Sequence, residues 1–341
     1  MSSTKKSPVI LTHQPQVGTL LGIWRFMCAI AYRYLCEILF FQHKIRDRKF
    51  WAAQQPDSIK AYPSRPMLRH HVFIPASHQE GQKHPLFILI HGVAFIVGTP
   101  HMDHAQARFL ADRHEYVVVD VSYRRAPEHR FPTAIHDAAA VIADVLVDRS
   151  LPVDAGRVVV GGFSAGAGIA LAVAQLPALR ARIAALVAFQ PLTDRTGAAK
   201  GAYPTAMPWG GPDDMQPTQM LAEWGFPAPG QDLRDRLLSP YYASRADIPQ
   251  PLCLVTGGAD MLCREGYLTA CKLAGRAADE SRMSEAWEEK GVKYWCAKDM
   301  PHGWTHFWVQ IKVKEWRDKQ LKSQDETWGE VTTWLDKVLY K

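Results

Sequence analysis

The 341-residue sequence lacks the features that mark several large classes of protein. It contains no lysine- and arginine-rich run interleaved with aromatic side chains, and its formal net charge of +6 is small for its length. Nothing in the sequence therefore favours a nucleic acid as partner. It also contains no internal repeat and no low-complexity block, which argues against a solenoid or other repeat architecture. With 47% hydrophobic residues, the chain can bury a large core within one α/β domain.

The cysteines are few and form no recognisable pattern. They show neither the paired CxxC spacing of a zinc site nor a compact disulfide framework, and the N-terminus does not read as a signal peptide. We therefore expect a reducing, cytoplasmic setting. The six cysteines are Cys28, Cys36, Cys253, Cys263, Cys271 and Cys296.

Short apolar runs alternate with helical stretches along most of the chain. Helical patterns such as residues 134–148 separate many of the strand-like runs, which predicts a mostly parallel sheet with helices on both faces. The predicted strands are residues 69–74, 86–91, 116–122, 157–162, 185–190, 252–257 and 293–297.

The stretch GGFSAGAG, residues 161–168, joins one of these strands to an alanine-rich helix. Ser164 stands between Gly162 and Gly166, which fits the G-x-S-x-G elbow, in which a serine occupies a strained strand-to-helix turn. The same five residues also fit a glycine-rich turn without chemistry. The motif therefore indicates a nucleophile only if suitable partners follow it.

A serine nucleophile needs a histidine to take its proton and a carboxylate to orient that histidine. Downstream, Asp260 follows the strand at 252–257, and His302 lies in a Pro-His-Gly turn after the strand at 293–297. Both loops are expected at the sheet edge that carries Ser164, in the order serine, acid, histidine. We prefer His302 to His306, because His306 follows the turn and lies in the segment that leaves the site. We prefer Asp260 to Asp299, because Asp260 follows a strand in the expected order and Asp299 reads as a cap of the turn.

His101 and His104 have a spacing that could hold a metal ion. No third ligand group lies nearby in the sequence, and residues 101–113 read as an ordinary exposed helix. We therefore predict no metal site, and no metal or organic cofactor.

Five motifs taken together resemble the hormone-sensitive-lipase-like branch of the α/β-hydrolase esterases. They are HGVAF (91–95), SYRRAPEHRFPTAIHDA (122–138), GFSAG (162–166), GGADMLCREG (257–266) and MPHGW (300–304). The resemblance runs from about His71 to the C-terminus and implies an α/β-hydrolase fold with a helical cap. It further implies Ser164 as nucleophile, Asp260 as orienting acid, His302 as general base, and Ala165 as one backbone donor of the oxyanion hole.

The chain departs from this family at the oxyanion loop. Val93 and Ala94 stand where the family has its second and third glycines. Their backbone N–H groups can still serve as donors if the loop keeps its path, but a β-branched Val93 is costly if that path needs a positive φ. At the elbow, Phe163 replaces a common acid and Ala167 a common glycine.

Two segments do not show the alternation of strand-like and helical stretches, and we assign both to a cap. The predicted organisation is a cap region at 1–58, an α/β-hydrolase core at 59–200 and 232–341, and a cap insertion at 201–231. Within the first segment, residues 19–44 read as an amphipathic helix whose charges, including an Arg33–Glu37 pair, share one face. Such a helix either covers the active site or lies on a membrane surface, and we favour the cap.

Aromatic side chains near the expected site suggest a bulky apolar pocket. The candidates for substrate contact are Phe95, Phe163, Tyr203 and Trp209. The predicted function is hydrolysis of a carboxylic ester of a small or medium apolar molecule through an acyl-enzyme. Two alternatives stay open: a non-hydrolytic enzyme such as a cyclase, condensing enzyme or lyase of specialised metabolism that uses His302 as base, and a small-molecule receptor.

Overall fold

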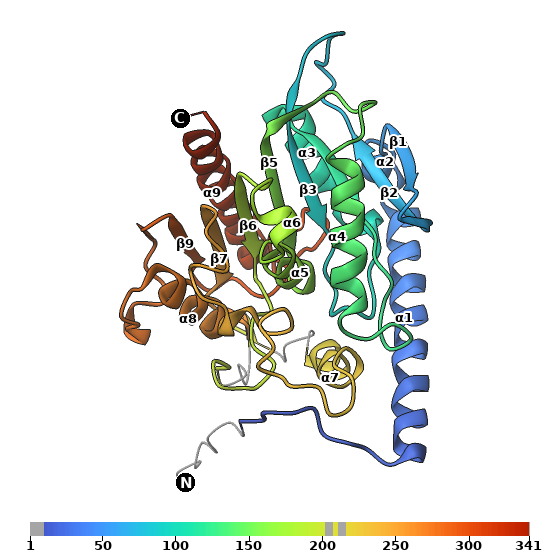
Figure 1. Cartoon of the computed structure of the whole chain (residues 1–341), viewed down its shortest axis with the longest axis vertical. Coiled ribbons are helices and arrows are strands. Elements are labelled where there is room, and N and C mark those ends of the chain that lie inside the picture. Colours follow the sequence, from blue (N-terminus) through green and yellow to red (C-terminus); the bar gives the residue numbers. More distant parts are fainter. Residues whose placement is uncertain (1–9, 202–206, 211–215, 341) are drawn as a thin grey trace.

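A mixed nine-stranded sheet forms the centre of the molecule (Figure 1). The computed structural model describes residues 10–201, 207–210 and 216–340. The strand order is β1-β2-β4-β3-β5-β6-β7-β9-β8. The six inner strands β4, β3, β5, β6, β7 and β9 run parallel to one another, whereas β2 and β8 run antiparallel to their inner neighbours. The strands are β1 (Ser58–Tyr62), β2 (Arg65–Phe73), β3 (His84–Ile90), β4 (Val117–Val121), β5 (Val153–Phe163), β6 (Ala185–Phe189), β7 (Leu252–Gly257), β8 (Trp287–Glu289) and β9 (Val292–Ala297).

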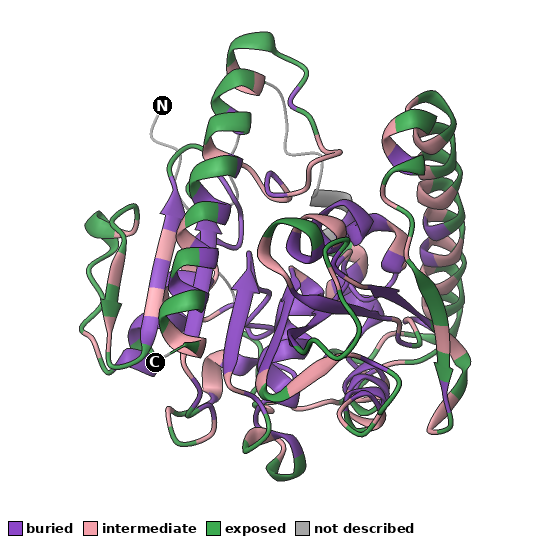
Figure 2. Ribbon diagram, turned by 90° about the horizontal axis from the view of Figure 1, so that it is seen from above, coloured by how far each residue is buried: buried purple, intermediate pink, exposed green. Residues whose placement is uncertain are grey.

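Helices cover both faces of this sheet, which buries the apolar central strands on both sides. Helices α3 (His104–His114) and α9 (Lys314–Leu339) pack on one face. Helices α4 (Thr133–Val145), α5 (Ala165–Val173) and α8 (Cys263–Ala274) pack on the other. Figure 2 shows the inner strands as buried, while the outer sides of several helices are exposed. The predicted α/β-hydrolase fold is confirmed.

The sequence pattern missed the two edge strands. Residues of β1 and β8 are mostly exposed or half-buried, so neither segment shows the apolar run that reveals a central strand. The prediction of an exposed helix at 101–113 was also wrong. The segment begins as a 3₁₀ turn (Pro100–Asp103), and residues 104–107 at the start of α3 are buried against the sheet.

The two segments predicted as a cap lie together. Helix α1 (Thr19–Arg46) contacts α7 (Gln216–Gly225), where the Tyr32 hydroxyl and Thr218 Oγ1 are 2.5 Å apart. The chain before α1 runs along the second segment, where Gly230 N donates to Gln14 O and Gln14 N donates to Gln231 O, both at 2.9 Å. The remaining short helices are α2 (Arg48–Ala52) and α6 (Pro177–Arg180), with 3₁₀ turns at Pro240–Tyr242 and Glu280–Arg282. The division into cap and core as separate units stays a prediction.

Helix α1 is fastened to the body through its charged face. Arg33 is buried and donates to both carboxylate oxygens of Glu128 at 2.6 Å and to Ile96 O at 2.8 Å. Glu37 accepts from Arg125 at 2.8 Å. The predicted Arg33–Glu37 pair is therefore wrong, because each residue pairs across to the loop 122–132 instead. Within the described ranges, no helix combines the length and apolarity needed to cross a bilayer.

Candidate active site

Ser164 occupies a strained turn between β5 and α5. Its φ of 55° and ψ of −115° are unusual for any residue other than glycine. A Cβ atom on Gly162 would lie 2.5 Å from Ile90 O, and one on Gly166 would lie 2.0 Å from the same oxygen. The flanking glycines are therefore required by the close approach of β3, which explains the pattern of small residues around Ser164.

Asp260 and His302 come together at the same edge of the sheet. Asp260 follows β7 and His302 follows β9, and His302 Nδ1 lies 2.9 Å from Asp260 Oδ2. The other carboxylate oxygen, Oδ1, accepts from Leu262 N at 2.8 Å. The Asp260 side chain is fully buried and that of His302 nearly so. A buried carboxylate with this bond holds an imidazole in one orientation and one tautomer.

Three glutamines that the sequence analysis missed hold the His302 loop in place. Gln190, at the end of β6, accepts from Gly303 N at 2.6 Å and donates to Thr305 at 3.1 Å. From α9, Gln320 and Gln324 donate to carbonyl oxygens of the same loop. Each glutamine is distant in sequence from the loop that it holds. The only local signal was a polar residue ending the apolar run ALVAFQ.

The loop after β3 takes a left-handed path. Val93, Ala94 and Phe95 have φ values of 67°, 62° and 64°. Among the described residues, the backbone N–H groups of Val93, Ala94 and Ala165 donate to no protein acceptor. Their role as oxyanion donors stays a prediction.

Tyr123 and His91 pack together at the start of this loop. The Tyr123 hydroxyl donates to His91 O at 3.0 Å, and the two rings stack with centroids 4.3 Å apart. Burial lowers the pKa of His91 to about 3, so this imidazole is neutral. Tyr123 belongs to the YRRAPEHRFP stretch and contacts this loop, whereas Arg125 and Glu128 of the same stretch bind helix α1.

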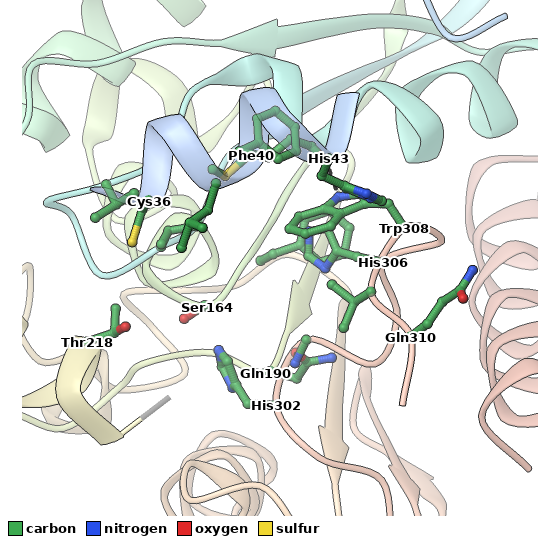
Figure 3. A pocket seen from close by; sticks show the side chains of 18 of the residues that line it. Cys36, Phe40, His43, Ser164, Gln190, Thr218, His302, His306, Trp308 and Gln310 are labelled. Atoms are coloured by element: carbon green, nitrogen blue, oxygen red, sulfur yellow. Dashed lines mark hydrogen bonds between the residues drawn. The ribbon is translucent and has the colours of Figure 1, made fainter. Parts of the chain in front are cut away.

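A cavity of about 470 Å³ opens above Ser164 and His302. Figure 3 shows both side chains directed into this space, with α1 passing above them. Helix α1 contributes Tyr32, Cys36, Leu39, Phe40, His43 and Arg46 to the lining. The rest of the lining is also mainly apolar, with Val93, Val97, Met102, Phe163, Trp308 and Val309.

The four residues predicted to contact substrate have different positions. Phe163 lines the cavity. Phe95 does not belong to the described lining, because its ring turns toward the cap and stacks on Phe226 at 3.7 Å. Trp209 lies against Trp316 of α9, with ring centroids 5.7 Å apart, and also falls outside that lining. Substrate contact by Phe95 and Trp209 stays a prediction; Tyr203 lies outside the described residues.

A second histidine–aspartate pair borders the same cavity. His306 Nε2 lies 2.9 Å from Asp103 Oδ1, and Asp103 is buried. His306 contacts the ring of Phe163 and lines the cavity together with His302. The sequence analysis set His306 aside because it follows the turn, and it could not foresee a partner two hundred residues away.

The spacing of His101 and His104 is completed by a third histidine. The sequence argument that no further ligand lies nearby was wrong, because His71 of β2 joins them, with ligand nitrogens within 4.8 Å of one another. His71 Nδ1 and His104 Nε2 are only 2.6 Å apart, which is a hydrogen bond. Two nitrogens of one tetrahedral zinc site would stand about 3.3 Å apart at zinc's usual bond lengths. The absence of a metal stays a prediction.

Comparisons with known proteins support the fold. Residues 87–305 match a family model described as the alpha/beta hydrolase fold. An acetyl-hydrolase of Streptomyces hygroscopicus is 32% identical over 222 residues, covering 63% of this chain and 70% of the relative. The carboxylic ester hydrolase LipN of Mycobacterium tuberculosis is 31% identical over 222 residues, covering 60% of this chain but only 58% of the relative.

Solved structures show the same fold. A hyperthermophilic esterase from the archaeon Pyrobaculum calidifontis superposes with a TM-score of 0.67 at 22% identity, covering 95% of this chain and 98% of that one. An esterase from the bacterial hormone-sensitive lipase family superposes with a TM-score of 0.63 at 21% identity, covering 84% and 86%.

The fold and the comparisons thus define the class of protein as a carboxylic ester hydrolase, as the sequence predicted. The chain belongs to the α/β-hydrolase fold family.

Proposed function

We propose that the protein hydrolyses carboxylic esters of small or medium apolar molecules through an acyl-enzyme formed on Ser164. The observation that carries this proposal is the 2.9 Å bond between His302 Nδ1 and Asp260 Oδ2, beside a serine held at positive φ. With Nδ1 bonded to the carboxylate, Nε2 is the nitrogen that takes the serine proton.

The reaction proceeds in two halves. Ser164 Oγ attacks the ester carbonyl carbon while His302 takes the proton of the serine hydroxyl. The negatively charged carbonyl oxygen then accepts hydrogen bonds from the backbone N–H groups of Val93, Ala94 and Ala165. His302 then gives the proton to the departing alcohol, which leaves an acyl-serine. Water attacks this ester with His302 again as base, and the carboxylic acid is released. Asp260 keeps the imidazole oriented and stabilises its charged form.

The lining of the cavity favours apolar substrates. Its walls are largely aliphatic and aromatic, and its volume of about 470 Å³ is within the range of small-molecule sites. Val93 stands next to the oxyanion donors, where it restricts the acyl group. These steps need no metal ion or organic cofactor, since each proton transfer is assigned to a side chain of the triad.

Replacement of Ser164 by alanine tests the proposal. Ser164→Ala should lower kcat on p-nitrophenyl butyrate by about 10⁵ to 10⁶ without loss of fold, because alanine fits the same elbow. Ser150→Ala, on an exposed loop, serves as the matched control and should leave the rate unchanged. If Ser164→Ala turned over the ester at the wild-type rate, the nucleophile assignment would be wrong.

A further inference from the structure

Helix α1 presents its apolar face to the outside. Of the twenty large hydrophobic side chains that are exposed among the described residues, eleven lie on this helix. We call this set the outer stripe: Leu20, Leu21, Ile23, Trp24, Met27, Tyr34, Leu35, Ile38, Leu39, Phe41 and Ile45.

The outer stripe is continuous along the helix. At 100° per residue, all but two of its members fall within roughly 60° of one line along the helix axis. The charged side chains that an amphipathic helix normally turns to water point the other way here, since Arg33 and Glu37 are bonded to the body of the protein. The exposed apolar area is on the order of 1,000 Å², whereas monomeric soluble proteins rarely expose patches above a few hundred.

We infer that the outer stripe docks on a lipid surface, with α1 lying in the plane of the membrane interface. Interfacial helices commonly have 20 to 30 residues, and α1 has 28. Trp24 and Tyr34 within the stripe are side chains suited to the boundary between headgroups and acyl chains.

Charge near the end of the stripe supports an anionic surface. Arg46, Arg48 and Lys49 are exposed where α1 passes into α2, and Asp47 is the one acidic residue among them. Each basic side chain near an anionic membrane contributes about 1 kcal/mol of attraction.

A second copy of the chain fits the outer stripe less well. Protein interfaces usually carry a hydrogen bond for every 100–200 Å² and a polar rim. Between Leu20 and Ile45, the one exposed residue of α1 with a strongly polar side chain is Gln42. The stripe therefore offers little to fix the register of a partner helix, which a fluid lipid surface does not require.

The same helix joins this surface to the cavity. Leu39 belongs both to the outer stripe and to the cavity lining, and the neighbouring Phe40 and His43 face the cavity from the other side of α1. Docking would place the cavity next to lipid, where apolar esters accumulate. This second part rests on the proposed ester hydrolysis, whereas the docking itself does not.

Vesicle flotation of full-length Ser164→Ala protein tests the docking without any turnover. The protein should float with vesicles of phosphatidylcholine containing about a third phosphatidylserine. The triple variant Trp24→Gln, Ile38→Gln and Phe41→Gln should bind about tenfold more weakly or worse. The matched control Val147→Gln, Val313→Gln and Leu321→Gln removes exposed apolar groups from other elements and should float like the parent.

Folding and function are checked separately. The same triple change in the otherwise wild-type chain should keep p-nitrophenyl butyrate turnover within about twofold, because none of the three residues lines the cavity. If the Ser164→Ala protein stays in the soluble fraction, the docking proposal is wrong. Light scattering would then show whether the protein is a monomer or a dimer joined through the outer stripe, and neither result would rescue the proposal. If Ser164→Ala floats but wild type cleaves no ester, the proposed function fails and the docking stands.

Discussion

Val93 offers a sharp test of the oxyanion loop, because its backbone conformation is strained for valine while its side chain packs in the cavity wall. Its φ of 67° is costly for a β-branched residue, at about 1–2 kcal/mol. Its side chain also lines the cavity next to Ser164. The change Val93→Gly removes both the strain and the side chain, while the backbone N–H remains.

The expected effects follow from these contributions. Relief of strain is offset by about 0.5–1 kcal/mol of glycine flexibility and by about 1 kcal/mol of lost packing from a half-buried side chain. The free energy of unfolding should therefore change by less than about 1 kcal/mol. An acyl chain that fills the vacated space gains about 0.8 kcal/mol per buried CH₂, so kcat/KM for octanoyl relative to acetyl esters should rise about tenfold.

Val97 provides the matched control, because it lines the same cavity but has no positive φ. Val97→Gly creates a gap without relieving strain and should lower the free energy of unfolding by about 2–4 kcal/mol. Both variants are measured by urea unfolding and by turnover of acetyl, butyryl and octanoyl p-nitrophenyl esters. Loss of activity on all three esters by Val93→Gly, together with a destabilisation equal to that of Val97→Gly, would refute the reasoning.

Three further outcomes are expected. Asp260→Asn should lower kcat by about 10³ to 10⁴ with little change in stability, because the amide no longer holds His302 in the right tautomer; a rate near wild type would remove Asp260 from the site. Dialysis against a chelator should leave ester turnover unchanged, and a loss that zinc restores would show that the His71–His104 cluster matters to activity. Burial lowers the pKa of His71 to about 4 and of His104 to about 2, below the value of about 6.5 in the unfolded chain. The unfolded chain then binds more protons, so the free energy of unfolding should fall as pH drops from about 6.5 to 5, by up to about 2 kcal/mol for each histidine; a flat profile in urea titrations would contradict this.

The placement of Ser164, Asp260 and His302 at one edge of the sheet was predictable, because each position depends on local sequence at the end of a parallel strand. The strands before Ser164, Asp260 and His302 are apolar runs, and parallel strands place their carboxyl ends at one edge. The residues that hold this edge in place were not predictable in the same way. Gln190 and Gln324 make contacts that only the folded chain brings together. The one local signal was the position of Gln190 at the end of an apolar run.

The orientation of α1 shows a second limit. Helical periodicity identifies which residues share a face but does not state which face turns inward. The usual expectation is that charged side chains face water. Here the guanidinium of Arg33 is buried and donates to the carboxylate of Glu128 and to two backbone carbonyl oxygens. The backbone path of the loop at Val93 could not be decided from the sequence either. A positive φ is rare for valine, and only the backbone of the folded chain reveals it.

The most direct test of the central claim is mass spectrometry of the intact protein and its peptides after exposure to a fluorophosphonate. An activated serine attacks the phosphorus and releases fluoride, which leaves a covalent phosphonate on its oxygen. One adduct per chain, located on Ser164 and lost in the variant His302→Ala, is the predicted result. A folded protein that carries no adduct, or carries it on another residue, would contradict the assignment of Ser164 as the nucleophile.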